Sequence, residues 1–355
     1  MANPLVDALI AGLSNVMNYL SEHTLTCLIP AFFIAGAIAA FVKKDAILRY
    51  FGPTVKRYKS YSVASVSGAV LAVCSCTILP LFAGIYRKGS GIGPAITFLF
   101  AGPGINILAI VYTAQVLGYD LGFARAASAV ALSIIVGLIM ATIFKRHDVS
   151  LIQEKKEFLP ASSANSRPRW ASAMFFVILI LILIIAASKI DWVLKLATVY
   201  LLTVVIAALL IYYFERDEVT NWAYETWDLT KKIFPILIAG TFIVGIIAYF
   251  LPPEMFRPYL GNNSISSNLL ASFIGAILYM PTLLEVPIIG TTFGYSSGVM
   301  AAGPALSLLL SGPTTSLPSI AVLYRIMGAK KTTIYWFTVV ILSALAGFIY
   351  GMIVG

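Results

Sequence analysis

Residues 93–103 read GPAITFLFAGP and residues 303–313 read GPALSLLLSGP, so two glycine–proline pairs recur at an offset of 210 positions. Gly118 and Gly137 have glycine partners at the same offset. Glycine and proline are common in membrane helices, so isolated matches carry little weight. Six matching glycine or proline positions at one offset, however, favour an internal duplication over chance.

The duplication extends upstream of these glycine–proline pairs. SGAVLAVCSCTILPLFAG, which begins at Ser67, matches IGAILYMPTLLEVPIIG, which begins at Ile274, at an offset of 207. Further upstream, IPAFFIAG from Ile29 resembles FPILIAG from Phe234. The predicted repeats are residues 25–144 and 229–355.

The composition is that of an integral membrane protein. The 355 residues are 60% hydrophobic and 11% charged, against about 45–50% and about 25% in soluble domains. We predict an all-α polytopic protein, because apolar stretches long enough to cross a bilayer recur along the chain. The ten predicted segments are residues 25–42, 62–87, 92–117, 121–144, 171–188, 195–214, 233–251, 268–293, 299–325 and 332–353.

Three further regions complete the predicted organisation. Residues 1–24 read as an interfacial helix, the polar residues 145–170 as a linker, and residues 171–214 as a connecting helix pair. The net charge of +9 could indicate nucleic-acid binding, but the basic residues lie in short loops and form no basic face. We therefore expect the lipid bilayer, and no nucleic acid, as a partner.

The distribution of lysine and arginine predicts how the segments cross the membrane. If all ten segments span it, 13 basic residues fall on one side and 11 on the other. If residues 62–87 and 268–293 are re-entrant hairpins, the counts become 20 and 4, as expected when cytoplasmic loops are enriched in positive charge. This predicts eight crossings of the cytoplasmic (inner) membrane, with the linker 145–170 in the cytoplasm. Making the other broken segment of each repeat re-entrant gives 18 and 6, so which segment turns back stays open.

The same arrangement gives the two repeats opposite orientations. Loop 43–61 carries six basic residues and its counterpart 252–267 carries one. Conversely, loop 118–125 carries one, Arg125, whereas loop 325–331 carries three. An inverted repeat with interrupted helices is typical of secondary transporters.

Four interruptions are expected to converge near the membrane midplane. A hairpin over 62–87 has its tip at Cys74 and Cys76, and one over 268–293 has its tip near Pro281. Broken backbone at that depth is tolerated only where protein or a water-lined cavity satisfies its polar groups, so we place the substrate there. The predicted helix breaks are Gly102, Pro103, Pro281, Pro287, Gly312 and Pro313.

Cys74 and Cys76 are the predicted substrate ligands. On a regular helix, residues two apart point about 200° away from each other and could not grip one ligand. Pro80 clashes with the carbonyl of Cys76, four residues earlier, and removes its hydrogen bond. We therefore expect an unwound chain in which the thiols converge, with Pro80 as part of the site. The alternative, a cysteine that packs as a small hydrophobe, is our interpretation of Cys27.

Two thiols without a neighbouring carboxylate favour a soft, neutral cargo. The two thiols could displace both hydroxyls of a trivalent organoarsenical, R–As(OH)2, as water, and the neutral adduct would bury no charge. Zinc would lack ligands, because His23 and His147 lie outside the predicted segments. No metal other than this metalloid cargo, and no cofactor, is predicted.

Glu285 is the only carboxylate inside a predicted segment, and it aligns with Ile78 of the first repeat. An acidic residue at that depth is costly and usually functional, so Glu285 is a candidate proton carrier. The alternative is a protonated carboxyl that bonds a carbonyl freed by Pro281 or Pro287.

Asn106 and Ser316 occupy equivalent repeat positions just after the glycine–proline breaks. They could bind substrate in the cavity or cap the helices that restart there, and the sequence does not decide between these roles.

Residues 74–106, CSCTILPLFAGIYRKGSGIGPAITFLFAGPGIN, together with GPALSLLLSGP in the second half, resemble a known family. It comprises predicted permeases and includes the bacterial organoarsenical efflux permeases (ArsP-like). The resemblance implies that a paired thiol handles trivalent methylated or aromatic arsenicals, a role that would fall on Cys74 and Cys76. Many members have no established substrate, so the resemblance implies the class more firmly than the cargo.

The combined prediction is a secondary transporter, an efflux permease for thiol-reactive metalloid species, that works by alternating access. The sequence contains no Walker loop, nucleophile elbow or HExxH helix, so we do not expect an enzyme. Uphill export would then use an ion gradient, with protons as the candidate, or an external partner. The alternatives are a permease for another soft sulfur or selenium solute, and a membrane thiol-redox protein that cycles Cys74 and Cys76 through a disulfide.

Overall fold

The computed structural model describes residues 4–21, 28–41, 49–52, 55–71, 75–145, 169–187, 191–250, 253–278, 280, 282 and 284–354. Cys27, Cys74 and Pro281 lie outside the described residues, as does most of the predicted linker 145–170.

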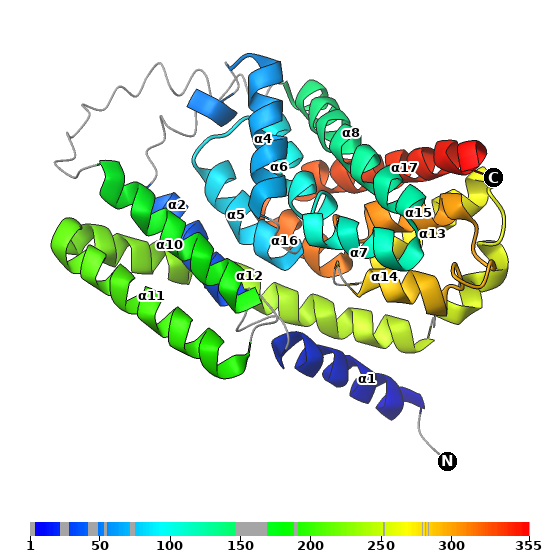
Figure 1. Cartoon of the computed structure of the whole chain (residues 1–355), viewed down its shortest axis with the longest axis horizontal. Helices are drawn as coiled ribbons and strands as arrows, with labels where there is room; N and C mark the ends of the chain where they lie inside the picture. The colour runs from blue at the N-terminus through cyan, green and yellow to red at the C-terminus, as the bar shows by residue number, and fades with distance from the viewer. Residues whose placement is uncertain are drawn as a thin grey trace.

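The described chain is helical and contains no strand (Figure 1). The first half comprises α1 (Pro4–Tyr19), α2 (Ile29–Phe41), α4 (Arg57–Leu71), α5 (Ser75–Arg87), α6 (Ile92–Gly104), α7 (Ile107–Leu117) and α8 (Tyr119–Ile143). The connecting pair is α10 (Arg169–Ala187) and α11 (Trp192–Tyr213). The second half comprises α12 (Arg216–Phe250), the 3-10 helix η2 (Pro253–Tyr259), α13 (Ile265–Ile277), α14 (Glu285–Pro287), the π-helix η3 (Ile288–Thr292), α15 (Ala302–Ser311), α16 (Leu317–Met327) and α17 (Ala329–Val354).

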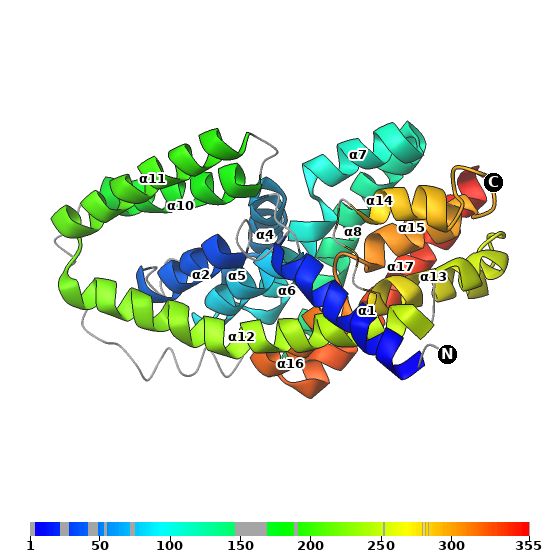
Figure 2. The ribbon, with the colours of Figure 1, turned by 90° about the horizontal axis from the view of Figure 1, so that it is seen from below.

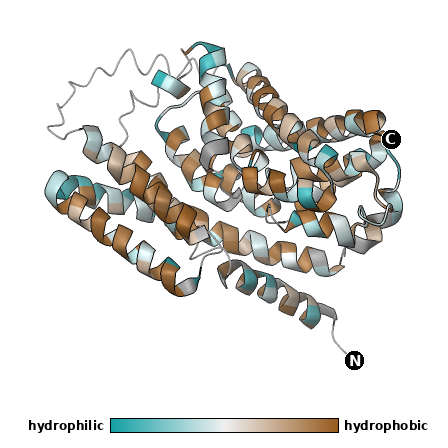
Figure 3. Ribbon diagram, viewed as in Figure 1, coloured by the Kyte–Doolittle hydropathy of each residue, from teal (hydrophilic) through white to brown (hydrophobic). Residues whose placement is uncertain are grey.

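Within the described residues, four helical stretches are long and apolar enough to cross a membrane: Tyr119–Ile143, Val193–Tyr213, Arg216–Ile247 and Ala329–Val354. Helices α6 and α7, which meet at an angle of 42°, make a fifth if they form one bent span. Apolar side chains face outward along α11, where Val193, Tyr200 and Ile211 are exposed, and Figure 3 shows the same apolar character along α10. The protein is therefore a multi-pass helical membrane protein.

In the part of the chain that the structure describes, interruptions occur inside three of the predicted segments. The segment 92–117 breaks at Ile105 and Asn106, two residues after the predicted Gly102–Pro103, because α6 continues to Gly104. The segment 299–325 breaks after α15 at Gly312, as predicted. The segment 268–293 breaks after α13 and restarts at Glu285. The chain keeps helical dihedral angles at Pro287, where α14 continues directly into the π-helix η3, so the helix does not stop at this proline.

The prediction that the chain unwinds between Cys76 and Pro80 is wrong. Helix α5 begins at Ser75 and runs through Pro80 to Arg87. Pro80 cannot donate a hydrogen bond to the carbonyl of Cys76, which is the second residue of α5. The proline therefore removes one hydrogen bond near the start of the helix without ending it.

The two halves repeat a close contact between small residues. A Cβ added to Gly68 of α4 would lie 2.9 Å from the backbone nitrogen of Gly102. A Cβ added to Gly275 of α13 would lie 3.1 Å from the backbone nitrogen of Gly312. In each half, glycine therefore lets one helix, α4 or α13, closely approach the backbone at the glycine–proline pair of α6 or α15.

Helices α7 and α16 also end alike. Gly118 follows α7 with φ +111°, and Gly328 follows α16 with φ +84°. Glycine adopts positive φ without steric cost, so each residue turns the chain directly into the next long helix, α8 or α17.

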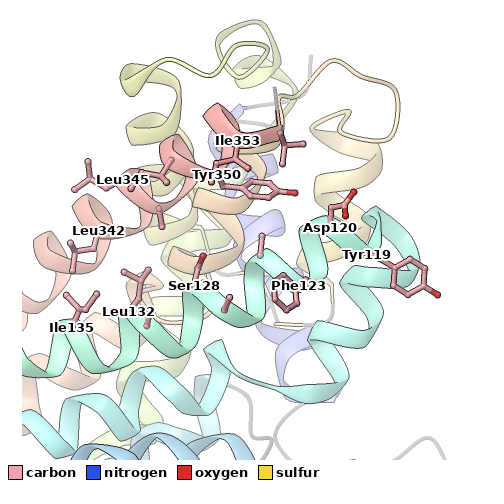
Figure 4. Close-up of a pocket in the computed structure, with 16 residues that line it drawn as sticks. Tyr119, Asp120, Phe123, Ser128, Leu132, Ile135, Leu342, Leu345, Tyr350 and Ile353 are labelled. Atoms are coloured by element: carbon pink, nitrogen blue, oxygen red, sulfur yellow. The ribbon is translucent and has the colours of Figure 1, made fainter. Parts of the chain in front are cut away.

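Helices α8 and α17 lie side by side and run antiparallel (Figure 4). They line a shared apolar groove of about 830 Å³, in which Asp120, at the start of α8, lies beside Tyr350, near the end of α17. Leu132 and Ile135, further along α8, lie beside Leu342. Contacts also cross between the halves elsewhere, because α5 packs on α16 and α14 packs on α7.

Helix α1 lies along α12 (Figure 2). Asn15 donates a hydrogen bond to the carbonyl oxygen of Thr241 at 2.8 Å, and Gly12 closely approaches Gly245. The opposite side of α1 exposes apolar residues such as Leu13. The interfacial placement of residues 1–24 remains a prediction.

Candidate functional site

A buried ion pair connects the two halves of the chain. Glu285 is the first residue of α14, and its side chain is completely buried. Its Oε1 lies 2.5 Å from an Nη atom of Arg125, which belongs to α8 and is also completely buried. Oε1 of the carboxylate is therefore paired with a cation. Residues 281 and 283 lie outside the described residues, so the alternative, a bond to a carbonyl freed by Pro281 or Pro287, stays a prediction.

Arg125 is the functional candidate that the sequence reasoning missed. The sequence analysis counts it as the basic residue of loop 118–125, although the predicted segment 121–144 also contains it; in the structure it lies within α8, about two turns from the N-terminus. Its other Nη atom donates to Oγ1 of Thr113 in α7 at 2.8 Å, and Thr113 in turn donates to the carbonyl of Ala109 at 2.7 Å. The available signal was an arginine flanked by apolar sequence on both sides, LGFARAASAVAL.

The pairing leaves one atom of each charged group unpartnered. Nε of Arg125 and Oε2 of Glu285 are buried and have no hydrogen-bond partner among the described residues. A buried ion pair rarely stabilises a fold more than apolar side chains of similar size would, and an incompletely bonded one does so still less. Stability therefore does not explain this pair.

Gly312, at the break after α15, closes over the carboxylate. A Cβ added there would lie 3.1 Å from Oε2 of Glu285. The break predicted at Gly312 and the carboxylate predicted at Glu285 are thus brought together. Thr282, in the break before α14, adds another buried hydroxyl without a partner in the described part of the chain.

The charged pair occurs at one of two equivalent places in the repeat. Glu285 aligns with Ile78, and Arg125 aligns with Tyr335 at the 210-residue offset. Both counterparts are buried, and the Tyr335 hydroxyl donates to the carbonyl of Thr314 at 3.1 Å. The same fold therefore fills the equivalent positions without a charge.

Asn106 and Ser316 both stand at helix N-termini, with different bonding. The side-chain oxygen of Asn106 accepts hydrogen bonds from the backbone nitrogens of Leu108 and Ala109, at 3.0 and 3.4 Å, so it caps α7. Ser316 makes no capping bond and shares a hydrogen bond of 2.9 Å with Ser319. Both side chains are buried.

The predicted thiol site lies largely outside the described residues. Cys74 is not described, and of Cys76 only the backbone position in α5 is described. Among the described residues, no group of three or more histidine, cysteine, aspartate or glutamate side chains could hold a metal ion.

Basic residues from three helices gather at one end of the bundle. Arg87 of α5 and Lys232 of α12 both contact Asp228, at 3.1 and 2.7 Å. Lys331 of α17 donates to the Tyr86 hydroxyl at 2.7 Å. Burial lowers the pKa of Lys88, while the neighbouring Glu225 carboxylate raises it. These residues all belong to the side for which we counted 20 basic residues.

Comparison with known proteins gives a consistent result. A family model described as a predicted permease matches residues 9–352. The UPF0718 protein MJ0584 of Methanocaldococcus jannaschii is 42% identical over 356 residues, which cover 96% of this chain and 95% of that protein. The UPF0718 protein YraQ of Escherichia coli is 23% identical over 84% of this chain and 68% of its own length. No solved structure matches this chain significantly.

Proposed function

Because the chain belongs to the predicted permease family, a family of transporters rather than enzymes, we propose that it is a secondary transporter that exports trivalent organoarsenicals or similar thiol-reactive metalloid solutes. It resides in the cytoplasmic membrane, and its cargo is a small molecule that crosses at a site formed by the helix breaks. Alternating access moves one half against the other.

The observation that carries the proposal is the relation between α8 and α17. These helices occupy equivalent positions in the sequence repeat, and they run antiparallel along one groove. Equivalent helices with opposite directions support an inverted repeat, which is the architecture expected of a secondary transporter.

Contacts at the segment ends support re-entrant hairpins at 62–87 and 268–293. Tyr61, at the start of the first hairpin, contacts Gly93, which follows its end, and it donates to the carbonyl of Gly137 at 3.4 Å. In the second half, a Cβ added to Gly303 would lie 3.0 Å from Oδ1 of Asn268. The start of each hairpin therefore contacts the start of the segment that follows it, as expected if the chain enters and leaves on the same side.

The gathering of Arg87, Lys232 and Lys331 at one end supports the proposed orientation. That end faces the cytoplasm, because cytoplasmic loops are enriched in lysine and arginine. The linker 145–170 follows α8 on the same side.

Cys74 and Cys76 are the proposed cargo ligands, at the tip of the first hairpin. Two thiols that displace both hydroxyls of R–As(OH)2 leave a neutral adduct, which avoids burying a charge. Of the two, Cys76 is the second residue of the described helix α5.

Protons are the proposed coupling ion and Glu285 their proposed carrier. Protonation of Glu285 removes the charge that pairs with Arg125, so it weakens the contact between α14 and α8. A proton gradient could thus bias the equilibrium between two arrangements of the halves.

The experiment that tests this function measures resistance of cells and uptake into everted vesicles with a panel of trivalent arsenicals. Wild type is compared with Cys74→Ser and Cys76→Ser, and Cys27→Ser is the matched control. We expect both site variants to lose transport and the control to keep it. Unchanged transport in both site variants would show that Cys74 and Cys76 are not the cargo ligands. Transport of only sulfur or selenium solutes would show that the cargo is not an arsenical.

A further inference from the structure

The ion pair between Arg125 and Glu285 holds two vacant hydrogen-bonding atoms of opposite kind. Nε of Arg125 is a donor and Oε2 of Glu285 is an acceptor, and both are buried without a partner among the described residues. Leaving such atoms unbonded in an apolar interior is costly, so a ligand that bonds both would be strongly favoured.

We propose that the Arg125–Glu285 pair binds a hydroxyl group of the cargo, which accepts a hydrogen bond from Nε and donates one to Oε2. This inference rests on the proposed transport function: the pair recognises a hydroxyl of the incoming cargo, before the two thiols displace both hydroxyls as water. The cargo class is a neutral solute with a hydroxyl on a trivalent metalloid centre.

The charge of the pair selects a neutral ligand. The guanidinium and the carboxylate sum to zero, so a neutral hydroxyl adds no net charge to the buried site. An anion would face the carboxylate of Glu285, and a cation would face the guanidinium of Arg125.

Gly312 lies close to the carboxylate in this structure, because a Cβ added to it would lie 3.1 Å from Oε2. The absence of a side chain at this helix break lets the carboxylate seat there. When α14 moves away from the break, the cargo hydroxyl takes the place of that contact.

The arrangement couples cargo to protons by competition. A proton on Oε2 takes the place of the hydroxyl hydrogen and turns Oε2 into a donor, and protonation also weakens the bond that holds Arg125 in place. A proton and the cargo therefore compete for one carboxylate oxygen, and competitive binding favours exchange transport in opposite directions.

The equivalent positions of the repeat offer a matched control. The double variant Arg125→Tyr/Glu285→Ile installs the residues that the fold already accepts at Tyr335 and Ile78. Replacing a buried pair by apolar side chains is often neutral for stability. A folded double variant therefore separates loss of binding from loss of structure.

The test uses two probes with the purified full-length protein. Both probes carry two hydroxyls on a neutral trivalent centre. Phenylboronic acid forms no stable adduct with thiols, whereas phenylarsonous acid, PhAs(OH)2, reacts with thiols. Binding is measured by calorimetry for wild type, Glu285→Gln, Arg125→Gln, the double variant, and Cys74→Ser/Cys76→Ser.

We expect phenylboronic acid to bind wild type and the cysteine variant equally, and to bind the three pair variants at least about tenfold more weakly, as for the loss of a bond to a charged group. Acidification should weaken binding to wild type and leave binding to Glu285→Gln unchanged. Equal affinity for wild type and the folded double variant would overturn the proposal. The proposal would also be overturned if phenylarsonous acid bound only through the cysteines and phenylboronic acid did not bind at all. Conversely, pair-dependent phenylboronic acid binding without any arsenical transport would refute the proposed cargo and leave the hydroxyl site standing.

Discussion

Arg125 of α8 and Glu285 of α14 stand 160 positions apart in the chain, yet their charged groups meet at 2.5 Å, completely buried. This contact joins the first half of the protein to the second. The same carboxylate also lies beside the helix break of its own half, because a Cβ added to Gly312 would lie 3.1 Å from Oε2 of Glu285.

Removing one partner of this pair should destabilise the protein more than removing both. Arg125→Gln leaves a buried carboxylate without its cation, so we expect the free energy of unfolding to fall by about 3–5 kcal/mol. Arg125→Tyr/Glu285→Ile should recover most of that loss. Unfolding titrations in detergent check this, with Arg87→Gln, at a partly exposed pair, as a control that costs at most about 1 kcal/mol. Equal losses in the single and double variants would contradict it.

The close helix approaches at Gly68 and Gly275 should be equally intolerant of a methyl group. Gly68→Ala and Gly275→Ala each place a Cβ against backbone, at 2.9 and 3.1 Å. We expect each to lower the free energy of unfolding by about 1–3 kcal/mol. Gly104→Ala, whose added Cβ has its nearest neighbour at 3.3 Å in the Phe100 ring, serves as the milder comparison. A tolerated methyl at either glycine would argue against the repeated contact.

The two helix starts after the glycine–proline pairs should respond differently to alanine. Asn106→Ala removes a cap that accepts two backbone hydrogen bonds, so we expect a loss of about 1 kcal/mol, largely restored by Asn106→Asp. Ser316→Ala removes no capping bond and should cost less. Thermal unfolding of the three variants measures the difference, and a larger loss at Ser316 would reverse the assignment.

The proposed inversion predicts which faces of the membrane are labelled. In a variant with Cys27, Cys74 and Cys76 replaced by serine, Lys56→Cys and Lys88→Cys should react with an impermeant maleimide from the same face. Tyr259→Cys, at the exposed η2, should react from the opposite face. Labelling of all three from one face would rule out the inverted arrangement.

The sequence by itself determined the class of protein and the places where helices stop. Apolar length, glycine and proline are local properties, and they identified a helical membrane protein, the break at Gly312 and the unusual carboxylate at Glu285. The break predicted at Gly102–Pro103 was displaced by two residues, because a proline limits a helix without fixing its last residue. The thiol site and the inversion of the repeats stay predictions.

Only the tertiary structure decided what Glu285 contacts. Its partner lies on another helix, in the other half of the chain, and no local pattern encodes which faces of two distant helices meet. In the sequence, Arg125 therefore counts as one more loop cation. In the structure it is buried within α8, where α14 packs on α7 and α7 packs on α8. Helix formation depends on neighbouring residues, whereas the pairing of buried charges depends on how the helices pack.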